Sequence, residues 1–270
     1  MLVVEDLHKS FVTAQGSLPV LRGVDLCLAA GESLALTGES GSGKSTLLHL
    51  IAGLDYPDGG RVLVDGVALH ARREAGLAQW RRTGIGLVFQ QYNLIGSLDV
   101  AANLDFQARL AGRHDAAWTA HLGERLGLTA LLSRYPEQLS GGQQQRVAIG
   151  RALASRPGLV LADEPTGSLD EASSDAVLDL LLALVRDAGS SLLMVTHSAR
   201  MAARLSRRVT LHLGKVSGDD GSVGVGAGAG VGADVAVATD AHTHTDVHAS
   251  AHAAPAAVAS DGGSPPAVRK

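Results

Sequence analysis

The sequence predicts an α/β fold with a mostly parallel core sheet. Short apolar segments typical of buried strands alternate with longer segments of helical periodicity, which is the pattern of a parallel sheet covered by helices. One apolar segment, residues 33–37, runs directly into glycines and is followed by a helical segment. A strand, a glycine-rich loop and a helix are therefore expected in this order.

The elements before residue 90 read mainly as strands. Residues 2–4 and 20–28 carry strand-like alternation or apolar runs, and residues 85–89 form a further apolar strand. Two more runs, 61–64 and 67–69, are separated by an Asp-Gly pair, which is typical of a tight hairpin turn.

The second half of the chain alternates again after a helical region. The pattern is helical between residues 97 and 132, which predicts an α-helical lobe at about 91–150 inserted into the sheet domain. Residues 175–185 predict a helix. Apolar runs predict strands at 159–162, 191–195 and 209–213, the last of these ending the sheet.

The composition changes near Val216. Residues 217–270 are rich in Gly, Ala, Val, Asp, Ser and His and contain no aromatic residue, so we expect a disordered tail after a folded domain at 1–216. Four histidines of this tail, His242, His244, His248 and His252, are read as solvated side chains rather than as a metal site.

Composition and charge exclude several classes of protein. Hydrophobic residues make up 46% of the chain, enough for a core, and the single cysteine, Cys27, excludes an internal disulfide. The tail holds six of the 27 acids and two of the 23 bases, so residues 1–216 carry 21 of each and offer no basic field for nucleic acid. We find neither a signal peptide nor a run of about 18 apolar residues. Another chain is expected to span the membrane if this one acts there.

The glycine-rich loop is the first candidate site. Gly38-Glu39-Ser40-Gly41-Ser42-Gly43-Lys44-Ser45 matches the phosphate-loop pattern between a strand and a helix that starts near Thr46. Glycines let backbone N–H groups surround the phosphates, and the helix N-terminus adds partial positive charge. Lys44 is expected on the β- and γ-phosphates and Ser45 on Mg²⁺. The sequence therefore predicts ATP and Mg²⁺ as ligands.

A pair of acids is the second candidate site. Asp163 and Glu164 follow the apolar run 159–162, at the carboxyl end of a strand, where ligands of open α/β sheets lie. We expect Asp163 to hold Mg²⁺, directly or through water. Glu164 is expected to orient or deprotonate the attacking water. The chain is therefore expected to hydrolyse ATP.

A second helix start decides the family. Leu139-Ser140-Gly141-Gly142-Gln143-Gln144-Gln145-Arg146 places a plausible N-cap, Ser140, before two glycines that leave the first N–H groups unobstructed. This segment resembles the signature motif of ATP-binding cassette (ABC) ATPases. The resemblance implies a P-loop NTPase cassette with a mostly parallel core sheet, an N-terminal antiparallel β subdomain and an inserted α-helical signature lobe.

Further motifs of that family match over residues 1–216. Gln90, at the end of a strand, resembles the Q-loop glutamine that senses Mg²⁺ and the lytic water, although Gln91 beside it leaves one position of ambiguity. His197 resembles the switch histidine, and Asp170 belongs to a segment similar to the D-loop. Phe11 stands where the family places an aromatic on adenine. The implied nucleotide-binding set is Phe11, Gly38–Thr46, Ser140, Gly141, Gly142, Gln143, Asp163 and Asp170, with Ser45, Gln90 and Asp163 at the metal and Glu164, His197 and Gln90 in catalysis.

The resemblance also implies an assembly. Cassettes of this family pair head to tail, with each ATP between the phosphate loop of one subunit and the signature helix of the other, on integral membrane permease subunits at the cytoplasmic face of the plasma membrane. Three segments are similar to the ATPases of the macrolide-exporter, lipoprotein-releasing and cell-division branch. They are residues 53–55 after the first helix, residues 88–94 around Gln90, and residues 164–170 after the catalytic acids.

The role of the ATPase and the function of one loop stay open at this level. The chain is either a transport ATPase or a mechanotransmitting ATPase that regulates a membrane partner in cell division or stress. A soluble ABC ATPase acting on DNA or ribosomes is disfavoured by the charge balance and the single cassette. The apolar loop 92–98 fits equally a docking surface for a permease and packing of the helical lobe.

Overall fold

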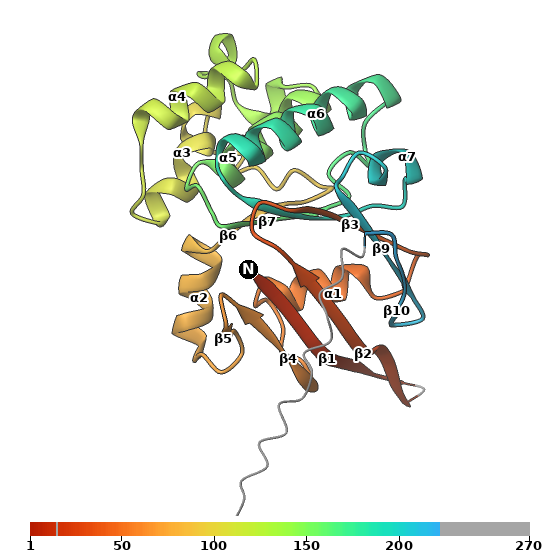
Figure 1. Ribbon diagram of the computed structural model, residues 1–270. Coiled ribbons are helices and arrows are strands. Elements are labelled where there is room, and N and C mark those ends of the chain that lie inside the picture. The colour runs from red at the N-terminus through yellow and green to blue at the C-terminus, as the bar shows by residue number, and fades with distance from the viewer. Residues whose placement is uncertain (15, 222–270) are drawn as a thin grey trace, which may run out of the picture. The chain divides into compact units, whose positions relative to one another are not determined.

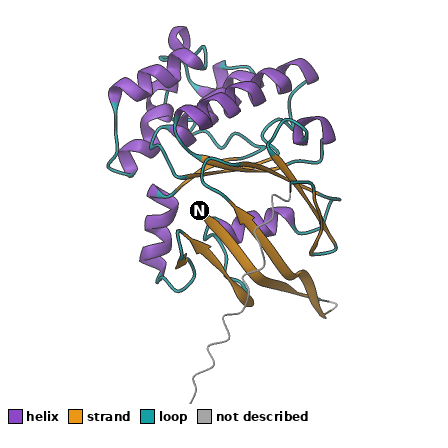
Figure 2. Ribbon diagram, in the orientation of Figure 1, coloured by secondary structure: helices purple, strands orange, loops and turns teal. Residues whose placement is uncertain are grey.

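A computed structural model of the chain describes residues 1–14 and 16–221, which form two β-sheets with helices around them (Figures 1 and 2). The predicted α/β fold is confirmed, with a mostly parallel core sheet and an antiparallel N-terminal sheet. The histidine tract and the rest of the predicted tail after residue 221 lie outside the described residues.

The core sheet has the strand order β10-β9-β3-β8-β7-β6. All neighbours in it are parallel except β9 and β10, which form an antiparallel hairpin. Its strands are β3 (Ser33–Thr37), β6 (Ile85–Val88), β7 (Leu159–Asp163), β8 (Ser191–Val195), β9 (Arg207–His212) and β10 (Lys215–Asp219).

The second sheet is antiparallel, with the order β2-β1-β4-β5. Its strands are β1 (Leu2–Thr13), β2 (Gly16–Leu28), β4 (Gly59–Val64) and β5 (Val67–Ala68). The predicted hairpin between β4 and β5 is confirmed, because Asp65 and Gly66 have φ values of 50° and 77°, as a tight primed turn requires.

One group of helices covers one face of the core sheet, and another helix packs on the opposite face, between the two sheets (Figure 1). Helices α3, α4, α5 and α6 lie over one face, and α1 lies between the core sheet and the antiparallel sheet. The helices are α1 (Lys44–Ile51), α2 (Glu74–Thr83), α3 (Val100–Leu110), α4 (Ala116–Arg125), α5 (Gly141–Leu153), α6 (Glu171–Asp187) and α7 (Ala199–Ala202). None of the described helices has the length and hydropathy needed to cross a bilayer.

Strands β3, β7 and β8 of the core sheet are buried on both faces, which explains their continuous apolar sequence. Val160 and Met194 belong to the cluster under the helices, whereas Leu161 and Leu193, one residue along, belong to the cluster that contains α1. This alternation follows from the two-residue period of a strand. It holds the carboxyl ends of β3, β7 and β8 rigidly in the middle layer.

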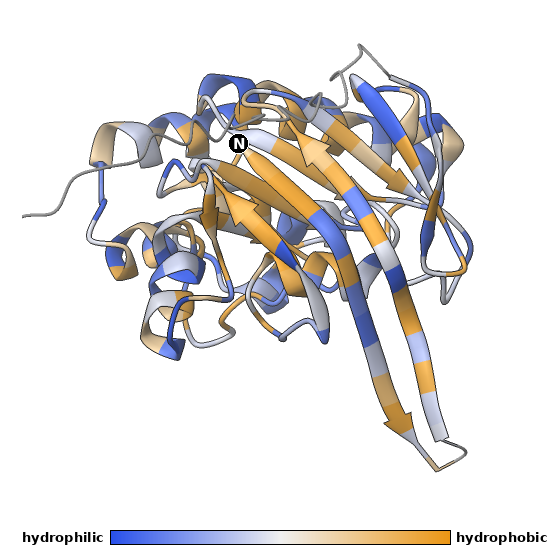
Figure 3. Ribbon diagram, turned by 60° about the horizontal axis from the view of Figure 1, so that its bottom comes forward, coloured by the Kyte–Doolittle hydropathy of each residue, from blue (hydrophilic) through white to orange (hydrophobic). Residues whose placement is uncertain are grey.

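The β1–β2 hairpin extends beyond the core (Figure 3). Leu2, Val4 and Leu7 of β1 are buried, but Val12 is 95% exposed and Leu18 of β2 is 53% exposed. The far half of the hairpin is therefore free to contact molecules other than its own core.

The end of the ordered domain corrects one prediction. Residues 209–213 are not the last strand, and the predicted boundary at 216 falls inside β10. Leu213 and Gly214, with φ values of 47° and 77°, reverse the chain so that Lys215–Asp219 pairs with β9. The strand was missed because an edge strand with one solvated face has few apolar residues.

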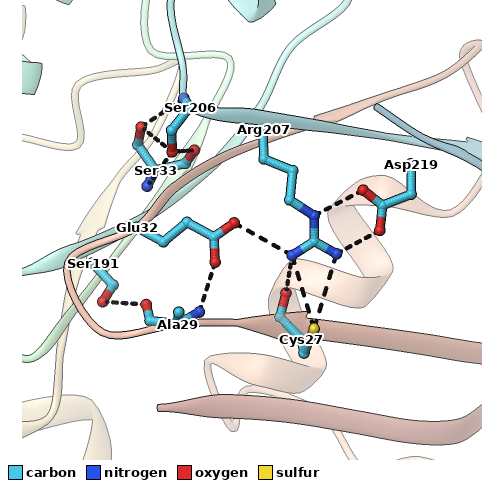
Figure 4. Close-up of polar contacts among 8 residues, drawn as sticks. All are labelled: Cys27, Ala29, Glu32, Ser33, Ser191, Ser206, Arg207 and Asp219. Atoms are coloured by element: carbon cyan, nitrogen blue, oxygen red, sulfur yellow. Dashed lines mark hydrogen bonds and ion pairs between the residues drawn. The ribbon is translucent and has the colours of Figure 1, made fainter. Parts of the chain in front are cut away.

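Arg207 ties this edge to the other sheet (Figure 4). Its guanidinium donates two hydrogen bonds to Asp219 at 2.8 and 2.5 Å and one to the Cys27 carbonyl at 3.0 Å, and it forms an ion pair with Glu32 at 3.3 Å. The hydrogen bonds between Arg207 and Asp219 lower the pKa of Asp219 and raise the pKa of Arg207. Cys27 therefore lies on a strand beside a partly buried arginine that forms hydrogen bonds within the fold.

Replacing Asp219 by Asn is expected to lower the free energy of unfolding at pH 7 by about 1–3 kcal/mol, because a charge-assisted bidentate pair is lost. The folded-state pKa of Asp219 is depressed, so its stabilisation is present above the usual value of 3.8 and disappears as the pH falls through the folded value. Urea unfolding of both proteins at several pH values measures this difference.

The matched control is Asp220→Asn. Asp220 pairs with Arg208 on the same hairpin, but the two side chains are 54% and 43% exposed, so the change is expected to cost about 0–1 kcal/mol. Equal losses in the two variants would contradict the role assigned to Arg207.

Candidate active site

The glycine-rich loop has a backbone that only glycines fit. Gly38 and Gly43 have φ values of 144° and 105°, and a Cβ atom on them would lie 2.1 Å from the Leu211 carbonyl oxygen and 2.7 Å from a Leu21 methyl group. The loop is therefore folded tightly against β2 and β9 and leads into the N-terminus of α1. Its amide groups are positioned to receive an anion.

Lys44 is held inside this loop. Its ammonium group donates hydrogen bonds to the Gly38 carbonyl at 2.9 Å and to the Glu39 carbonyl at 2.8 Å, and the residue is 7% exposed. The neighbouring Ser42 hydroxyl is buried without a hydrogen-bond partner. The loop thus contains a buried cation and a free hydroxyl at the place predicted to bind phosphates.

Ser45 and Asp163 meet beside the loop. Ser45, the second residue of α1, lies near Asp163, which ends β7 next to β8. Burial raises the pKa of Asp163, and the nearby Ser45 hydroxyl opposes this rise. A partly buried carboxylate and a hydroxyl on adjacent elements form an oxygen ligand set of the kind that Mg²⁺ prefers.

Glu164 follows Asp163 in an unusual backbone conformation. Its φ value is 45°, and its N–H donates to the Val195 carbonyl at 3.0 Å. Its carboxylate lies 3.0 Å from Nδ1 of His197, which comes after β8 and is 67% exposed. Positive φ at a non-glycine residue is costly and occurs often at functional sites. The bond to β8 directs Glu164 away from the sheet and toward the loop.

Gln90, two residues after the end of β6, lies in the vicinity of Glu164. Its side-chain amide lies 3.0 Å from the position that a Cβ atom on Gly167 would take, and a Glu164 oxygen lies 3.3 Å from that same position. The side chain of Gln90 therefore points to Gly167 and the vicinity of Glu164.

A cavity of about 610 Å³ connects the glycine-rich loop with Glu164 and His197, whereas Asp163 and Gln90 are not among its lining residues. The described residues that line it are Leu18, Val20, Ser40, Gly41, Gly43, Lys44, Ser45, Thr46, Glu164 and His197. Sequence reasoning missed Leu18 and Val20, which carry no motif. Phe11 lies outside this lining, with the Lys9 ammonium 5.2 Å from its ring centre, so its contact with adenine stays a prediction.

The signature turn lies outside that cavity. Ser140 accepts a hydrogen bond from the Gln143 N–H, and the Gln143 side chain accepts one from the Ser140 N–H, so the predicted N-cap is confirmed as a capping box. Space is open where a Cβ atom on Gly142 would be. Asp170 caps α6 through Ser173, whose hydrogen bond lowers the pKa of Asp170.

Comparisons with known proteins assign the chain to a family. The sequence model of the ABC transporter family matches residues 21–167. The chain belongs to this family. The lipoprotein-releasing system ATP-binding protein LolD of Anaeromyxobacter dehalogenans is 48% identical over 79% of this chain and 91% of its own length. The methionine import ATP-binding protein MetN of Caulobacter vibrioides is 44% identical over 78% of this chain, which spans 64% of MetN.

Solved structures agree with this assignment. The dimeric structure of MJ0796, a bacterial ABC transporter cassette, has a TM-score of 0.76 at 34% identity, covering 83% of this chain and 100% of MJ0796. A second dimeric structure of MJ0796 is a post-hydrolysis state bound to ADP and Pi, with a TM-score of 0.76 at 33% identity. The chain is thus an ATP-binding ATPase subunit of the ABC transporter family, whose subunits form dimers and work with membrane permeases.

Proposed function

We propose that the chain hydrolyses ATP in a head-to-tail dimer and powers a separate membrane permease. The carrying observation is the separation of two anion-binding helix starts: the Lys44 loop lines the 610 Å³ cavity, whereas the capped turn at Ser140 lies outside it. A second subunit placing its Ser140 turn over the first subunit's cavity would complete the site, as the dimeric relative MJ0796 suggests.

The residue roles follow from charge and reach. Lys44 and the loop amides bind the phosphates, with Ser140, Gly141, Gly142 and Gln143 of the second subunit on the opposite side. Glu164 accepts a proton from the attacking water. His197, whose Nδ1 lies 3.0 Å from the Glu164 carboxylate, orients that carboxylate. Asp170, the N-cap of α6, would lie at the contact between the two subunits.

Mg²⁺ fits the donor set at the end of β7. Ser45, Asp163 and Gln90 would hold the ion, which would neutralise phosphate charge during hydrolysis. The proximity of Ser45 to Asp163 supports this choice, because it brings two oxygen ligands together beside the loop.

A second cavity supports the permease partner. This docking groove, of about 570 Å³, has apolar walls that include Leu87, Phe89, Ile95 and Phe106. Asn103 fixes its loop, since its amide donates to the Ile95 carbonyl at 3.1 Å and its carbonyl accepts from the Ile95 N–H at 2.9 Å. Leu94 of the same loop packs on the core, so the loop 92–98 serves both packing and surface.

The groove also has a charge preference. Arg81, Arg82 and Arg151 line it, and none of its lining residues is acidic. An amphipathic permease helix with a carboxylate beside its apolar face therefore suits it best. This partner would hold the chain at the cytoplasmic face of the membrane.

Reversing one groove charge tests the partner. Arg82→Glu is expected to reduce, by about tenfold or more, the amount of the co-purifying integral membrane protein, because a repulsive pair replaces an attractive one. The ATPase rate of the isolated chain should not change. The control is Arg73→Glu, an exposed arginine just before α2 that lies outside the groove lining. If both variants retain the membrane protein equally, the groove is not the docking site.

The branch of the family decides what the permease does. LolD is named for lipoprotein release and MetN for methionine import, so the relatives differ in direction. We favour an export or lipoprotein-releasing role because LolD is matched over nearly its full length. The alternative is a mechanotransmitting ATPase that regulates a membrane partner, and the identity of the co-purifying protein separates the two.

A further inference from the structure

Tyr92 joins segments of the active site that are far apart in the sequence. Its hydroxyl shares a hydrogen bond with the Ser168 hydroxyl at 3.1 Å, across 76 positions of the chain. The same oxygen lies 2.7 Å from the place that a Cβ atom on Gly141 would occupy. The hydroxyl therefore fills the notch left by the first glycine of α5.

The backbone of Tyr92 is fixed as well. Arg151 of α5 donates hydrogen bonds to the Tyr92 carbonyl at 3.2 Å and to the Asn93 carbonyl at 2.7 Å. Arg151 also lines the docking groove. Tyr92 thus contacts the body of α5 through its backbone carbonyl and the start of α5 through its side chain.

The turn after Glu164 is the third segment in this arrangement. Gly167 donates its N–H to the Glu164 carbonyl at 3.0 Å, and Leu169 donates to Thr166 at 3.1 Å, so the turn is a compact continuation of Glu164. The Gln90 side chain meets this turn at Gly167 and the Tyr92 hydroxyl meets it at Ser168. Two contacts from one loop hold the turn in register.

We propose that Tyr92 is a positioning residue for ATP hydrolysis, whose hydroxyl sets the signature turn at Gly141 and the turn after Glu164 relative to the Gln90 loop. This inference rests on the proposed function, because the signature turn acts on the ATP of the second subunit. The phosphate loop makes none of these contacts. Loss of the hydroxyl therefore slows hydrolysis and leaves nucleotide binding to the single subunit intact.

A double-mutant cycle on the full chain tests this role. Tyr92→Phe and Ser168→Ala are each expected to lower kcat about fivefold, the size of one lost hydrogen bond, and to change the ATP dissociation constant less than about twofold. The double variant is expected to match either single variant, because the two hydroxyls share one bond. Tyr56→Phe is the matched control, since its hydroxyl bonds to Glu74 at 3.1 Å, away from these loops.

Three results would overturn the proposal: a kcat for Tyr92→Phe equal to that of Tyr56→Phe, losses that multiply in the double variant, or a weakened ATP affinity at unchanged kcat. The proposed dimer is measured separately, by size-exclusion chromatography of Glu164→Gln with ATP. A monomer in that experiment would count against the head-to-tail site, whereas the cycle in kcat judges Tyr92 by itself.

Discussion

Replacing Glu164 by Gln is expected to lower ATP hydrolysis by about 10²–10⁴-fold, the range that a general base contributes. The amide keeps the size of the side chain and can still contact His197, which lies 3.0 Å from the carboxylate, but it cannot take the proton of the attacking water. ATP binding should remain, because Lys44 and the loop amides are unchanged. Phosphate release and equilibrium ATP binding measure the two effects.

The same variant should accumulate as an ATP-bound dimer, since binding closes the pair and hydrolysis no longer opens it. Glu124→Gln is the control, because Glu124 lies on α4 outside the cavity lining. Hydrolysis at the parental rate in Glu164→Gln would assign the proton transfer to another residue. Loss of ATP binding would instead indicate that the carboxylate holds the loop in shape.

The fold was predictable where burial is repeated along the sequence. Strands β3, β7 and β8 of the core sheet are apolar on both faces, so their predicted ranges fall within a residue of their bounds. The strand β10 was not, because one of its faces is solvated and Arg207, rather than apolar packing, helps to hold its end at Asp219. A contact between residues 12 positions apart leaves no local pattern.

The residues of the candidate site that stand in local motifs could be selected from the sequence. The residues that distant segments bring to it could not. Lys44 and Glu164 stand in local motifs, because a loop or a strand end must carry its chemistry within a few residues. Leu18 and Val20 reach the cavity from a distant strand, and Tyr92 reaches Ser168 across 76 positions of the chain. Such contacts depend on how the sheets and helices pack, and the sequence alone does not express that packing.

Lys44→Ala is expected to weaken ATP binding by about 10–100-fold, which corresponds to the loss of a charge-assisted hydrogen bond of about 1.5–3 kcal/mol. In the structure the ammonium group is already buried, with the Gly38 and Glu39 carbonyls at 2.9 and 2.8 Å. Phosphate oxygens can replace these neutral acceptors, so the bound state gains an ion pair that the variant cannot make. Titration with ATP at several salt concentrations measures the loss, and the salt dependence of affinity should become shallower.

The matched control is Lys215→Ala, which removes an exposed lysine on β10 and should leave ATP affinity unchanged. The variant Lys44→Ala must also be compared with the parent in urea, because its two carbonyl acceptors lose their donor and the loop itself could loosen. Weaker ATP binding together with parental unfolding identifies Lys44 as a phosphate ligand. Equal affinity in Lys44→Ala and Lys215→Ala would remove the glycine-rich loop from the binding site and, with it, the head-to-tail arrangement that depends on a phosphate held there.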